Sequence, residues 1–157
     1  MVINELTQKE CSDMLSHTSL GRLGCALDDQ PYVVPIYFAY DDNHLYVLST
    51  LGQKIEWMRA NPKVCVQVDE IQSEAQWVSI VVNGRYQELP EVQYAAEQAR
   101  ARKLLQKRYR WWQTAMAERQ LKVGADLIDP LFFRIHIDSM TGLRALPETE
   151  SSSPSKK

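Results

Sequence analysis

The sequence predicts an α+β fold made mainly of β-strands, most simply a small antiparallel barrel of about six strands with short helices. Two observations lead to this prediction. Short runs rich in β-branched and aromatic residues recur along the chain, and polar turns separate the first three of them. One helical pattern interrupts the runs in mid-chain, without the regular strand–helix alternation of a parallel sheet. The motifs GxGxxG and GxxxxGKS/T are absent, which argues against a Rossmann fold or a P-loop.

The first half of the chain is expected to form a helix followed by an antiparallel meander of three strands. Thr7 followed by Glu10 is the capping-box pattern, so residues 4–17 are expected to be helical around this cap. Tight turns built from Asp, Asn and Gln then connect the strands. The expected strands are 21–27, 32–40 and 44–50, and the expected turns are 28–30 and 41–43.

The second half adds a short helix, three further strands and a longer helix. Asn61 and Pro62 end the short helix, because the residue before a proline disfavours the helical conformation. Gly84 lies inside a strand pattern, which indicates a bulge or a close approach of the backbone. The expected helices are 54–60 and a longer segment near 91–122, and the expected strands are 63–69, 77–86 and 131–137, with a polar loop at 70–75.

Length and composition place these elements in one domain, residues 1–146, followed by a low-complexity tail, residues 147–157, that is expected to be disordered. The net charge of −2 gives no general attraction to nucleic acid. No apolar run approaches the roughly 18–20 residues that cross a membrane, and the N-terminal residues lack the pattern of a secretory signal. We therefore expect a cytoplasmic protein without nucleic-acid or membrane partners.

One segment, residues 100–113, allows two interpretations. Its sequence, RARKLLQKRYRWWQ, interleaves basic and aromatic residues, as a nucleic-acid or membrane-surface element does. The same pattern is typical of a solvated helical face whose tryptophans pack on the barrel. The solvated face is favoured, because the basic run is short and the chain as a whole is acidic.

The cysteines and histidines give no sign of a disulfide framework or a metal site. An odd number of cysteines without CxxC spacing argues against both a disulfide framework and a thiolate zinc site. The histidines form neither an HxH nor an HxxxH pair, so we expect no metal site. The residues concerned are Cys11, Cys25, Cys65, His17, His44 and His136.

The most informative stretch is the junction between the third strand and the short helix, residues 49–54, which reads Ser-Thr-Leu-Gly-Gln-Lys. Gly52 allows a close approach of the backbone, and the hydroxyl groups can donate hydrogen bonds. A helix N-terminus offers unpaired N–H groups with a partial positive charge, and Lys54 adds a full one. The junction has what a phosphate site needs, although such residues also meet at strand–helix connections by chance.

Taken together, several segments resemble the pyridoxamine 5′-phosphate oxidase-like, FMN-binding split-barrel superfamily, and within it the nitroimidazole-resistance (Nim-like) branch. The segments are GRLG, QPYVVPIYFAYDDNHLYVLSTLGQKIEWMRANPKVCVQVD and WVSIVVNGRYQEL, all within residues 5–90. FFRIHIDSMTGLRA resembles the final strand of that branch. The resemblance implies a six-stranded antiparallel split β-barrel and a homodimer, with FMN bound at the subunit interface.

The resemblance also implies which residues hold the FMN phosphate. Lys54 matches the phosphate-binding basic residue of the family. Gln53 lies where many members have an arginine, so one charged contact is missing. Ser49, Thr50 and Gly52 match positions around the phosphate and the ribityl chain.

A second set of matching residues would surround the flavin ring. Pro35, Ile36 and Tyr37 match a strand whose backbone lines the edge of the isoalloxazine ring. Trp77 and Ser79 match strand positions that the partner subunit offers to the flavin. Pro35, Tyr37, Trp77 and Ser79 could each also be an ordinary strand or core residue.

The activity implied by the resemblance is that of a flavin-dependent oxidoreductase acting on a small organic substrate, with FMN carrying the redox chemistry. The C-terminal residues, GLRALPETESSSPSKK, lack the Arg-rich, Trp-containing motif that grips the substrate phosphate in true pyridoxamine-phosphate oxidases. Vitamin B6 oxidation is therefore not expected. No side chain is identified as a catalytic acid or base.

Other interpretations remain open at this point. The chain could be a non-catalytic flavin or haem protein that stores, senses or shields its ligand, with His17, His44 or His136 as an axial ligand. His44 is expected to lie in a turn and to be exposed. The barrel could instead have lost its cofactor and serve as a dimeric interaction module. A deazaflavin in place of FMN is a variant of the leading interpretation.

Overall fold

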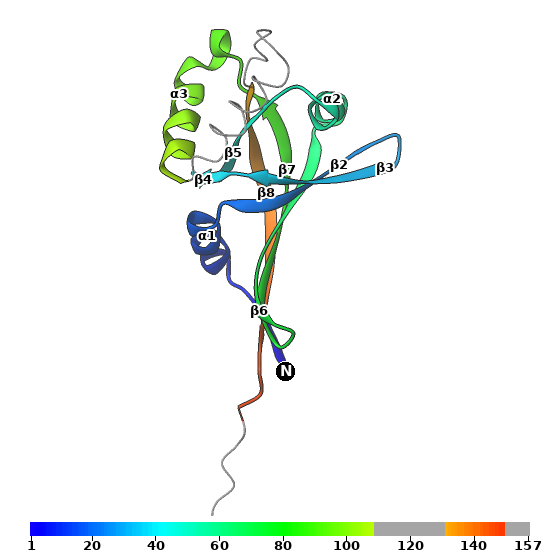
Figure 1. The fold of residues 1–157 in the computed structure, drawn as a ribbon, viewed down its shortest axis with the longest axis vertical. Helices are drawn as coiled ribbons and strands as arrows, with labels where there is room; N and C mark the ends of the chain where they lie inside the picture. The colour runs from blue at the N-terminus through cyan, green and yellow to red at the C-terminus, as the bar shows by residue number, and fades with distance from the viewer. Residues whose placement is uncertain (109–130, 150–157) are drawn as a thin grey trace, which may run out of the picture.

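An antiparallel sheet of eight strands runs through the part of the chain that the computed structural model describes, residues 1–108 and 131–149 (Figure 1). The strands lie in the order β3-β2-β6-β7-β8-β5-β4, and β1 pairs with β8 outside this path. The predicted α+β class is confirmed, with two more strands than the six expected. The bounds are β1 Val2–Glu5, β2 Leu20–Leu27, β3 Gln30–Tyr37, β4 Ala39–Asp41, β5 His44–Ser49, β6 Lys63–Ser73, β7 Gln76–Glu88 and β8 Leu131–Leu146.

Three helices in the described residues accompany the sheet. The first, α1, begins at the predicted capping box: the Thr7 hydroxyl accepts the Glu10 N–H at 3.2 Å, and the Glu10 carboxylate accepts the Thr7 N–H at 2.9 Å. The last, α3, covers part of the helix expected near 91–122, and residues 109–122 lie outside the described part of the chain. The bounds are α1 Gln8–His17, α2 Gln53–Ala60 and α3 Glu91–Arg108.

The N-terminal residues differ from the expectation of a helix that starts at residue 4. Residues 2–5 form strand β1, and the helix begins only after the Thr7 cap. β1 pairs antiparallel with the end of β8, and Ile3 lies opposite Ala145 in this pairing. Because the partner strand comes from the far end of the sequence, the local pattern of residues 2–5 carries no signal of the pairing.

The other differences concern where strands break or continue. The expected strand 32–40 is divided at the fully buried Phe38, where the chain crosses from β3 at one end of the strand order to β4 at the other. Much of the loop expected at 70–75 is strand, because β6 and β7 stay paired as a hairpin out to Ser73 and Gln76. β8 extends well beyond the expected 131–137, since its second half pairs with both β1 and β7.

The helices pack into two separate cores, one on each side of β5. Leu15 of α1 and Ile55 and Met58 of α2 are fully buried in the main core on the inner face. Ala101 and Leu105 of α3 join a second core with residues of β4, β5 and β8. Alternate residues of β5 contribute to the two cores, as the period of a strand requires, so α3 lies on the outer face.

The described part of segment 100–113 is engaged with its own chain. Arg100 forms an ion pair with Asp41, and the Arg102 guanidinium lies 5.1 Å from the centroid of the Phe132 ring. These contacts agree with a helix that packs on the barrel, and residues 109–113 lie outside the described part. Within residues 1–108 and 131–149, no helix combines the length and the apolar character needed to cross a membrane.

The outer face of β2, β3, β6, β7 and the second half of β8, here called the open face, carries exposed apolar side chains. The strand register places five of them on this one face. Their exposed fractions range from 38% to 69%, which is high for large apolar residues gathered on one surface. The residues are Leu20, Val33, Ile71, Val81 and Leu143.

Gly84 marks a close approach between β7 and β8. The register of these strands shifts between Asn83 and Gly84, which confirms the predicted irregularity. A Cβ atom at Gly84 would lie 2.3 Å from the backbone oxygen of His136 and 2.8 Å from the side chain of Ile135. A backbone atom cannot give way without moving the strand, so glycine is required here for space.

We expect Gly84→Ala to lower the free energy of unfolding by about 2–3 kcal/mol, because β8 must move to admit the methyl group. Gly52→Ala is the control. No described atom lies within 4 Å of a Cβ at Gly52, so its loss should stay below about 1 kcal/mol. Urea unfolding followed by circular dichroism measures both values. Equal losses for the two variants would contradict the close approach at Gly84.

Candidate functional site

The junction between β5 and α2 presents an open helix N-terminus. Gly52 is the N-cap residue and has an extended backbone, with φ −180° and ψ −174°. As a glycine, the N-cap residue makes no side-chain hydrogen bond to the helix, and the first turn closes through the Glu56 N–H and the Gly52 oxygen at 3.2 Å. The space around Gly52 leaves room for an anion beside the first N–H groups, where the helix also carries a partial positive charge.

A comparison with α1 shows how α2 differs. Lys9 and Lys54 occupy the second position of their helices, and each follows a glutamine. In α1 the preceding Thr7 belongs to a capping box that satisfies the helix end. At the equivalent position α2 has Gly52, which has no side chain that could accept a hydrogen bond from the first N–H groups of the helix. The two helices therefore start with the same residues but leave different groups for a ligand.

Lys54 places a positive charge next to this helix end. Burial raises the pKa of the Cys25 thiol and the nearby Cys65 raises it further, whereas the charge of Lys54 lowers it. Lys54 therefore lies near enough to Cys25 of β2 for its charge to act on that thiol. Ser49, the last residue of β5, is 8% exposed, and its hydroxyl donates to the Thr50 carbonyl at 3.1 Å. Gln53 begins α2 and is exposed.

The second predicted set of residues lies on β3 and β7. The strand register puts Pro35 and Tyr37 of β3 and Trp77 and Ser79 of β7 on the open face. Ile36 points the other way and is 4% exposed in the main core, so only its backbone could contact a ligand. β3 is at one end of the strand order, a position that tolerates a proline.

Ser79 belongs to a polar network on the open face. Its hydroxyl accepts a hydrogen bond from the Gln67 amide at 3.1 Å, and the same amide donates to Asp69 at 2.8 Å. Arg22 donates to both Asp69 at 3.2 Å and Gln67 at 3.3 Å. Because these bonds use only an acceptor position of Ser79, its hydroxyl proton is still available to a further acceptor.

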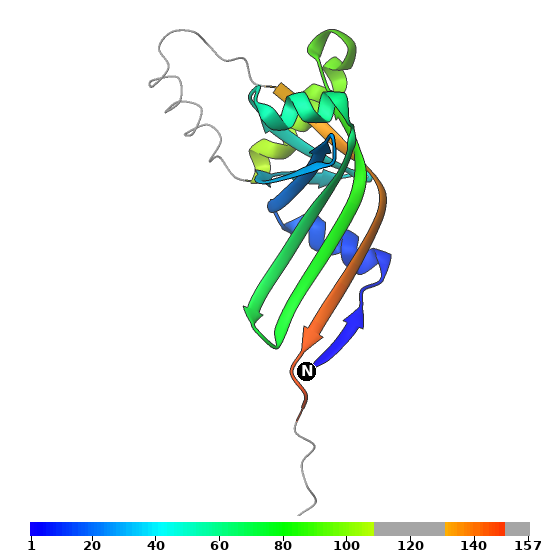
Figure 2. The same ribbon diagram turned by 90° about the vertical axis from the view of Figure 1, so that its right-hand side faces the viewer.

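The two sets occupy separate places in one chain. Trp77 lies opposite Ile71 near the turn of the β6–β7 hairpin. Figures 1 and 2 both show α2 at the end of the sheet away from that turn. A single small ligand bound at the α2 N-terminus would therefore not reach Trp77 of the same chain.

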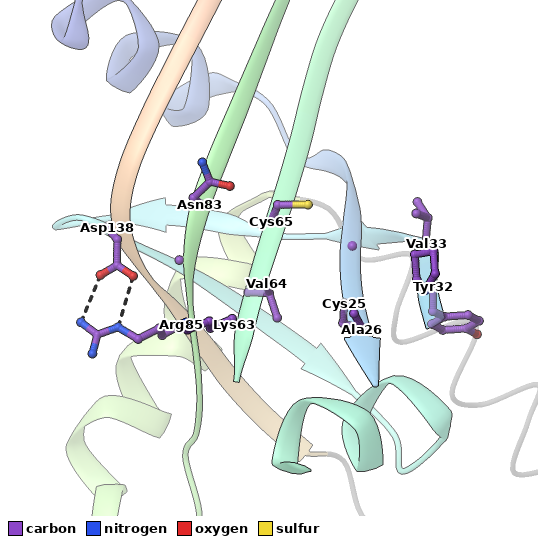
Figure 3. A pocket seen from close by; sticks show the side chains of 13 residues that line it. Cys25, Ala26, Tyr32, Val33, Lys63, Val64, Cys65, Asn83, Arg85 and Asp138 are labelled. Carbon is purple, nitrogen blue, oxygen red and sulfur yellow. Dashed lines mark hydrogen bonds and ion pairs between the residues drawn. The ribbon is translucent and has the colours of Figure 1, made fainter. Parts of the chain in front are cut away.

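A pocket of about 530 Å³ opens on the outer side of β2, β3, β6 and β7 (Figure 3). Charged groups lie at one end, where the Arg85 guanidinium donates to both carboxylate oxygens of Asp138 at 3.0 Å and 3.2 Å. None of the ten predicted site residues is among those that line the pocket. The lining residues are Gly24, Cys25, Ala26, Pro31, Tyr32, Val33, Lys63, Val64, Cys65, Asn83, Gly84, Arg85 and Asp138.

The sequence offered few signals of this pocket. A charged Arg85 inside a strand and a glycine beside it were the visible features, and neither indicates which strands lie next to one another. Gly24 lies opposite Cys65, and a Cβ atom at Gly24 would come within 2.8 Å of the Cys65 sulfur. The hollow therefore depends on a pairing between β2 and β6 that residue patterns do not reveal.

Two histidines that are far apart in the sequence, His44 and His136, lie next to each other in the structure. His44 of β5 lies directly opposite His136 of β8, and His44 Nε2 is 3.3 Å from His136 Nδ1. His44 is half-buried at the start of a strand, in contrast to the exposed turn position expected for it. Burial lowers the pKa of His44, and the nearby Arg134 and His136 lower it further, whereas the hydrogen bond to the Asp42 carbonyl raises it.

The third histidine, His17, is exposed on α1 and lies 3.9 Å from Glu70. Because His44 and His136 stand side by side, they are not placed to bind iron from opposite faces of one haem. Among the described residues, no three His, Cys, Asp or Glu side chains converge as a set of metal ligands.

A family model and a curated relative both match nearly the whole of this chain. A family model described as pyridoxamine 5′-phosphate oxidase matches residues 7–144. An uncharacterized protein of Rhizobium meliloti is 42% identical over 146 residues, which are 92% of this chain and 97% of the relative.

Two solved structures show the same fold. A FAD-binding protein from Mesorhizobium loti is 42% identical, with a TM-score of 0.76 over 94% of this chain and 99% of that one. A candidate 5-nitroimidazole antibiotic resistance protein from Bacteroides thetaiotaomicron is 18% identical, with a TM-score of 0.64 over 92% of this chain and 89% of that one.

Proposed function

The chain belongs to the pyridoxamine 5′-phosphate oxidase family, and we propose that it is an FMN-binding, flavin-dependent oxidoreductase that acts on a small organic substrate as a homodimer. The observation that carries this proposal is the N-terminus of α2, where the N-cap Gly52 supplies no side-chain cap and is open to solvent and Lys54 lies in the first turn. A phosphate dianion is the chemical group that such a helix end accommodates best.

At this site, the FMN phosphate would lie against the first N–H groups of α2. Lys54 would supply one full positive charge, and Gln53 a neutral amide donor where a second charge could have been. Ser49 and Thr50 come three and two residues before Gly52, and they would lie on the ribityl side of a bound nucleotide. The residues at the junction thus fit the phosphate, and the neutral Gln53 makes the site weaker in charge than one with two cations.

The ring of the flavin would rest on apolar and aromatic side chains of the open face, where Pro35 and Tyr37 lie. Since Trp77 and Ser79 are remote from α2 within one chain, they would serve the flavin of a partner subunit. Bound FMN supplies one- and two-electron redox chemistry, and the protein positions the ring and keeps water from it. The hydroxyl proton of Ser79 is available to a carbonyl or nitrogen at the ring edge.

The FAD-binding protein of Mesorhizobium loti is 42% identical to this chain, and this similarity supports the proposal that the chain binds a flavin. FMN and FAD share the ring, the ribityl chain and the first phosphate, so the α2 site would serve either. Mass spectrometry of the ligand released from purified protein separates FMN from FAD and from a deazaflavin. An absorbance spectrum separates all three from haem, whose Soret band dominates its spectrum.

The apolar residues of the open face support the proposed homodimer. Five large apolar side chains are exposed there, and a surface of this kind is typical of an interface between subunits. The pocket in Figure 3 opens on the same face, so a partner subunit would help to enclose it. An enclosed pocket of this size could hold a small organic substrate.

Replacing Lys54 tests the phosphate assignment. We expect Lys54→Ala to weaken FMN binding about tenfold to hundredfold, because one charge-assisted contact is lost. Binding of riboflavin, which has no phosphate, should not change. Gln53→Arg should tighten FMN binding and leave riboflavin unaffected. Fluorescence quenching titrations measure these affinities.

The control is Lys9→Ala, which removes a lysine from the same helical position in the capped helix α1. It should bind FMN as the unmodified chain does. If Lys54→Ala and the unmodified chain bind FMN equally well, the phosphate does not lie at α2. If riboflavin and FMN lose affinity together, the variant has disturbed the ring site instead.

Replacing a residue of the open face tests the dimer. Val81→Lys would place a charge among the apolar residues of that face, so we expect it to shift the protein from dimer to monomer and to weaken FMN binding as well. Val92→Lys is the matched control, because Val92 is 98% exposed on α3 and away from the open face. Light scattering coupled to size-exclusion chromatography measures the mass. A dimer that survives Val81→Lys would place the interface elsewhere.

A further inference from the structure

We infer that His44 and His136 form a two-residue chelate for a divalent transition-metal ion of the zinc or copper class, separate from the flavin site. The pair bridges β5 and β8, whose register places the two residues directly opposite each other. The two facing ring nitrogens, His44 Nε2 and His136 Nδ1, are 3.3 Å apart. The pair shares no residue with the α2 junction or with the predicted flavin-ring residues.

The distance between the two nitrogens suits a shared metal ion. Histidine nitrogens bind Zn²⁺ at about 2.0–2.1 Å in tetrahedral geometry, so two of them on one ion stand roughly 3.3–3.4 Å apart. The observed 3.3 Å meets this spacing before any strand has moved.

The groups behind the two rings have the arrangement that supports metal ligands. His44 Nδ1 is 2.7 Å from the Asp42 carbonyl oxygen, which can only accept, so Nδ1 carries the proton and Nε2 presents a lone pair. His136 Nε2 lies 3.8 Å from a carboxylate oxygen of Asp138, which Arg85 holds in place with two hydrogen bonds. A carbonyl and a carboxylate behind the two ligands are the partners that fix and polarise metal-bound histidines.

Metal binding would also resolve a mismatch in the unbound pair. His44 Nε2 is an acceptor, so a hydrogen bond between the rings requires the proton of His136 on Nδ1. A neutral His136 would then turn a lone pair toward the Asp138 carboxylate. With a metal ion on Nδ1, the proton moves to Nε2 and faces the carboxylate instead, which is the favourable arrangement.

The surrounding charges and exposure set the kind of ion and its affinity. Arg134 and Arg85 lie nearby, and each is already engaged, Arg134 by Gln87 at 2.7 Å and Arg85 by Asp138 at 3.0 Å. Their positive charges oppose a cation, and Asp138 offsets part of this. The His136 side chain is 44% exposed, so an ion can enter and water can complete its coordination. Imidazole nitrogens favour zinc and copper over magnesium or calcium.

Titration of the full chain with Zn²⁺, followed by isothermal calorimetry, tests the site. We expect one ion per chain, and binding at least about tenfold weaker in His44→Ala and in His136→Ala. His17→Ala removes the exposed histidine outside the pair, and Cys65→Ser removes the half-exposed thiol. Both controls should bind Zn²⁺ like the unmodified chain. Affinity should fall as the pH is lowered, because protons compete with the metal ion for the imidazole nitrogens.

Electron paramagnetic resonance of the Cu²⁺-loaded chain provides a readout that does not depend on heat. Two coupled nitrogens are expected in the unmodified chain and fewer in either variant of the pair. The inference is overturned if Zn²⁺ binding survives in the double variant of His44 and His136, or if His17→Ala or Cys65→Ser abolishes it. It is also overturned if the unmodified chain takes up no ion while the pair variants only lower thermal stability, which is the result for a plain hydrogen-bonded pair.

Discussion

The pairing of β8 is the constraint on which the rest of the structure depends. Along its length β8 pairs with β7, its first half also pairs with β5, and its second half pairs with β1. This arrangement fixes the close approach at Gly84, places His136 opposite His44 and extends the sheet into the open face. The helices cover the sheet that β8 holds together: α1 and α2 pack on its inner face and α3 packs on its outer face. The candidate sites all lie on surfaces that this one ladder holds in register.

The N-terminus of α2 differs from that of α1 because its N-cap residue supplies no side-chain cap. Both α1 and α2 begin with glutamine and lysine, and in α1 a threonine and a glutamate complete the cap. A capped helix end is satisfied by its own chain, whereas an uncapped one depends on water or a ligand. Glycine in place of a capping Ser, Thr, Asn or Asp costs only a few tenths of a kcal/mol, and a bound phosphate that accepts from the first N–H groups would offset this cost. The absence of a side chain at Gly52 therefore connects a small loss of stability with a possible function.

Features encoded by neighbouring residues could be predicted from the sequence, and features that depend on distant pairings could not. The capping box at Thr7, the two acidic turns and the irregularity at Gly84 each need only a few adjacent residues, and all appear in the structure. The residue pattern missed β1 because it is a strand only through its pairing with β8, and it missed the second half of β8 because the partners of that half, β1 and β7, lie elsewhere in the sequence. The candidate sites divide in the same way. Residues 49–54 are contiguous, so their pattern could be recognised in the sequence, whereas the His44–His136 pair and the pocket combine residues from strands far apart in the sequence.

The position of β8 at the end of the described chain has a consequence for synthesis on the ribosome. Until Leu131–Leu146 has emerged, β1, β5 and β7 each expose an edge whose N–H and C=O groups have no partner strand from β8. The hairpins β2–β3, β4–β5 and β6–β7 can form early because each joins strands adjacent in sequence. Between the synthesis of Glu88 and that of Leu146, the nascent chain therefore carries three hairpins whose edges have no partner strand from β8. Its risk of aggregation is concentrated in the interval before the last strand arrives.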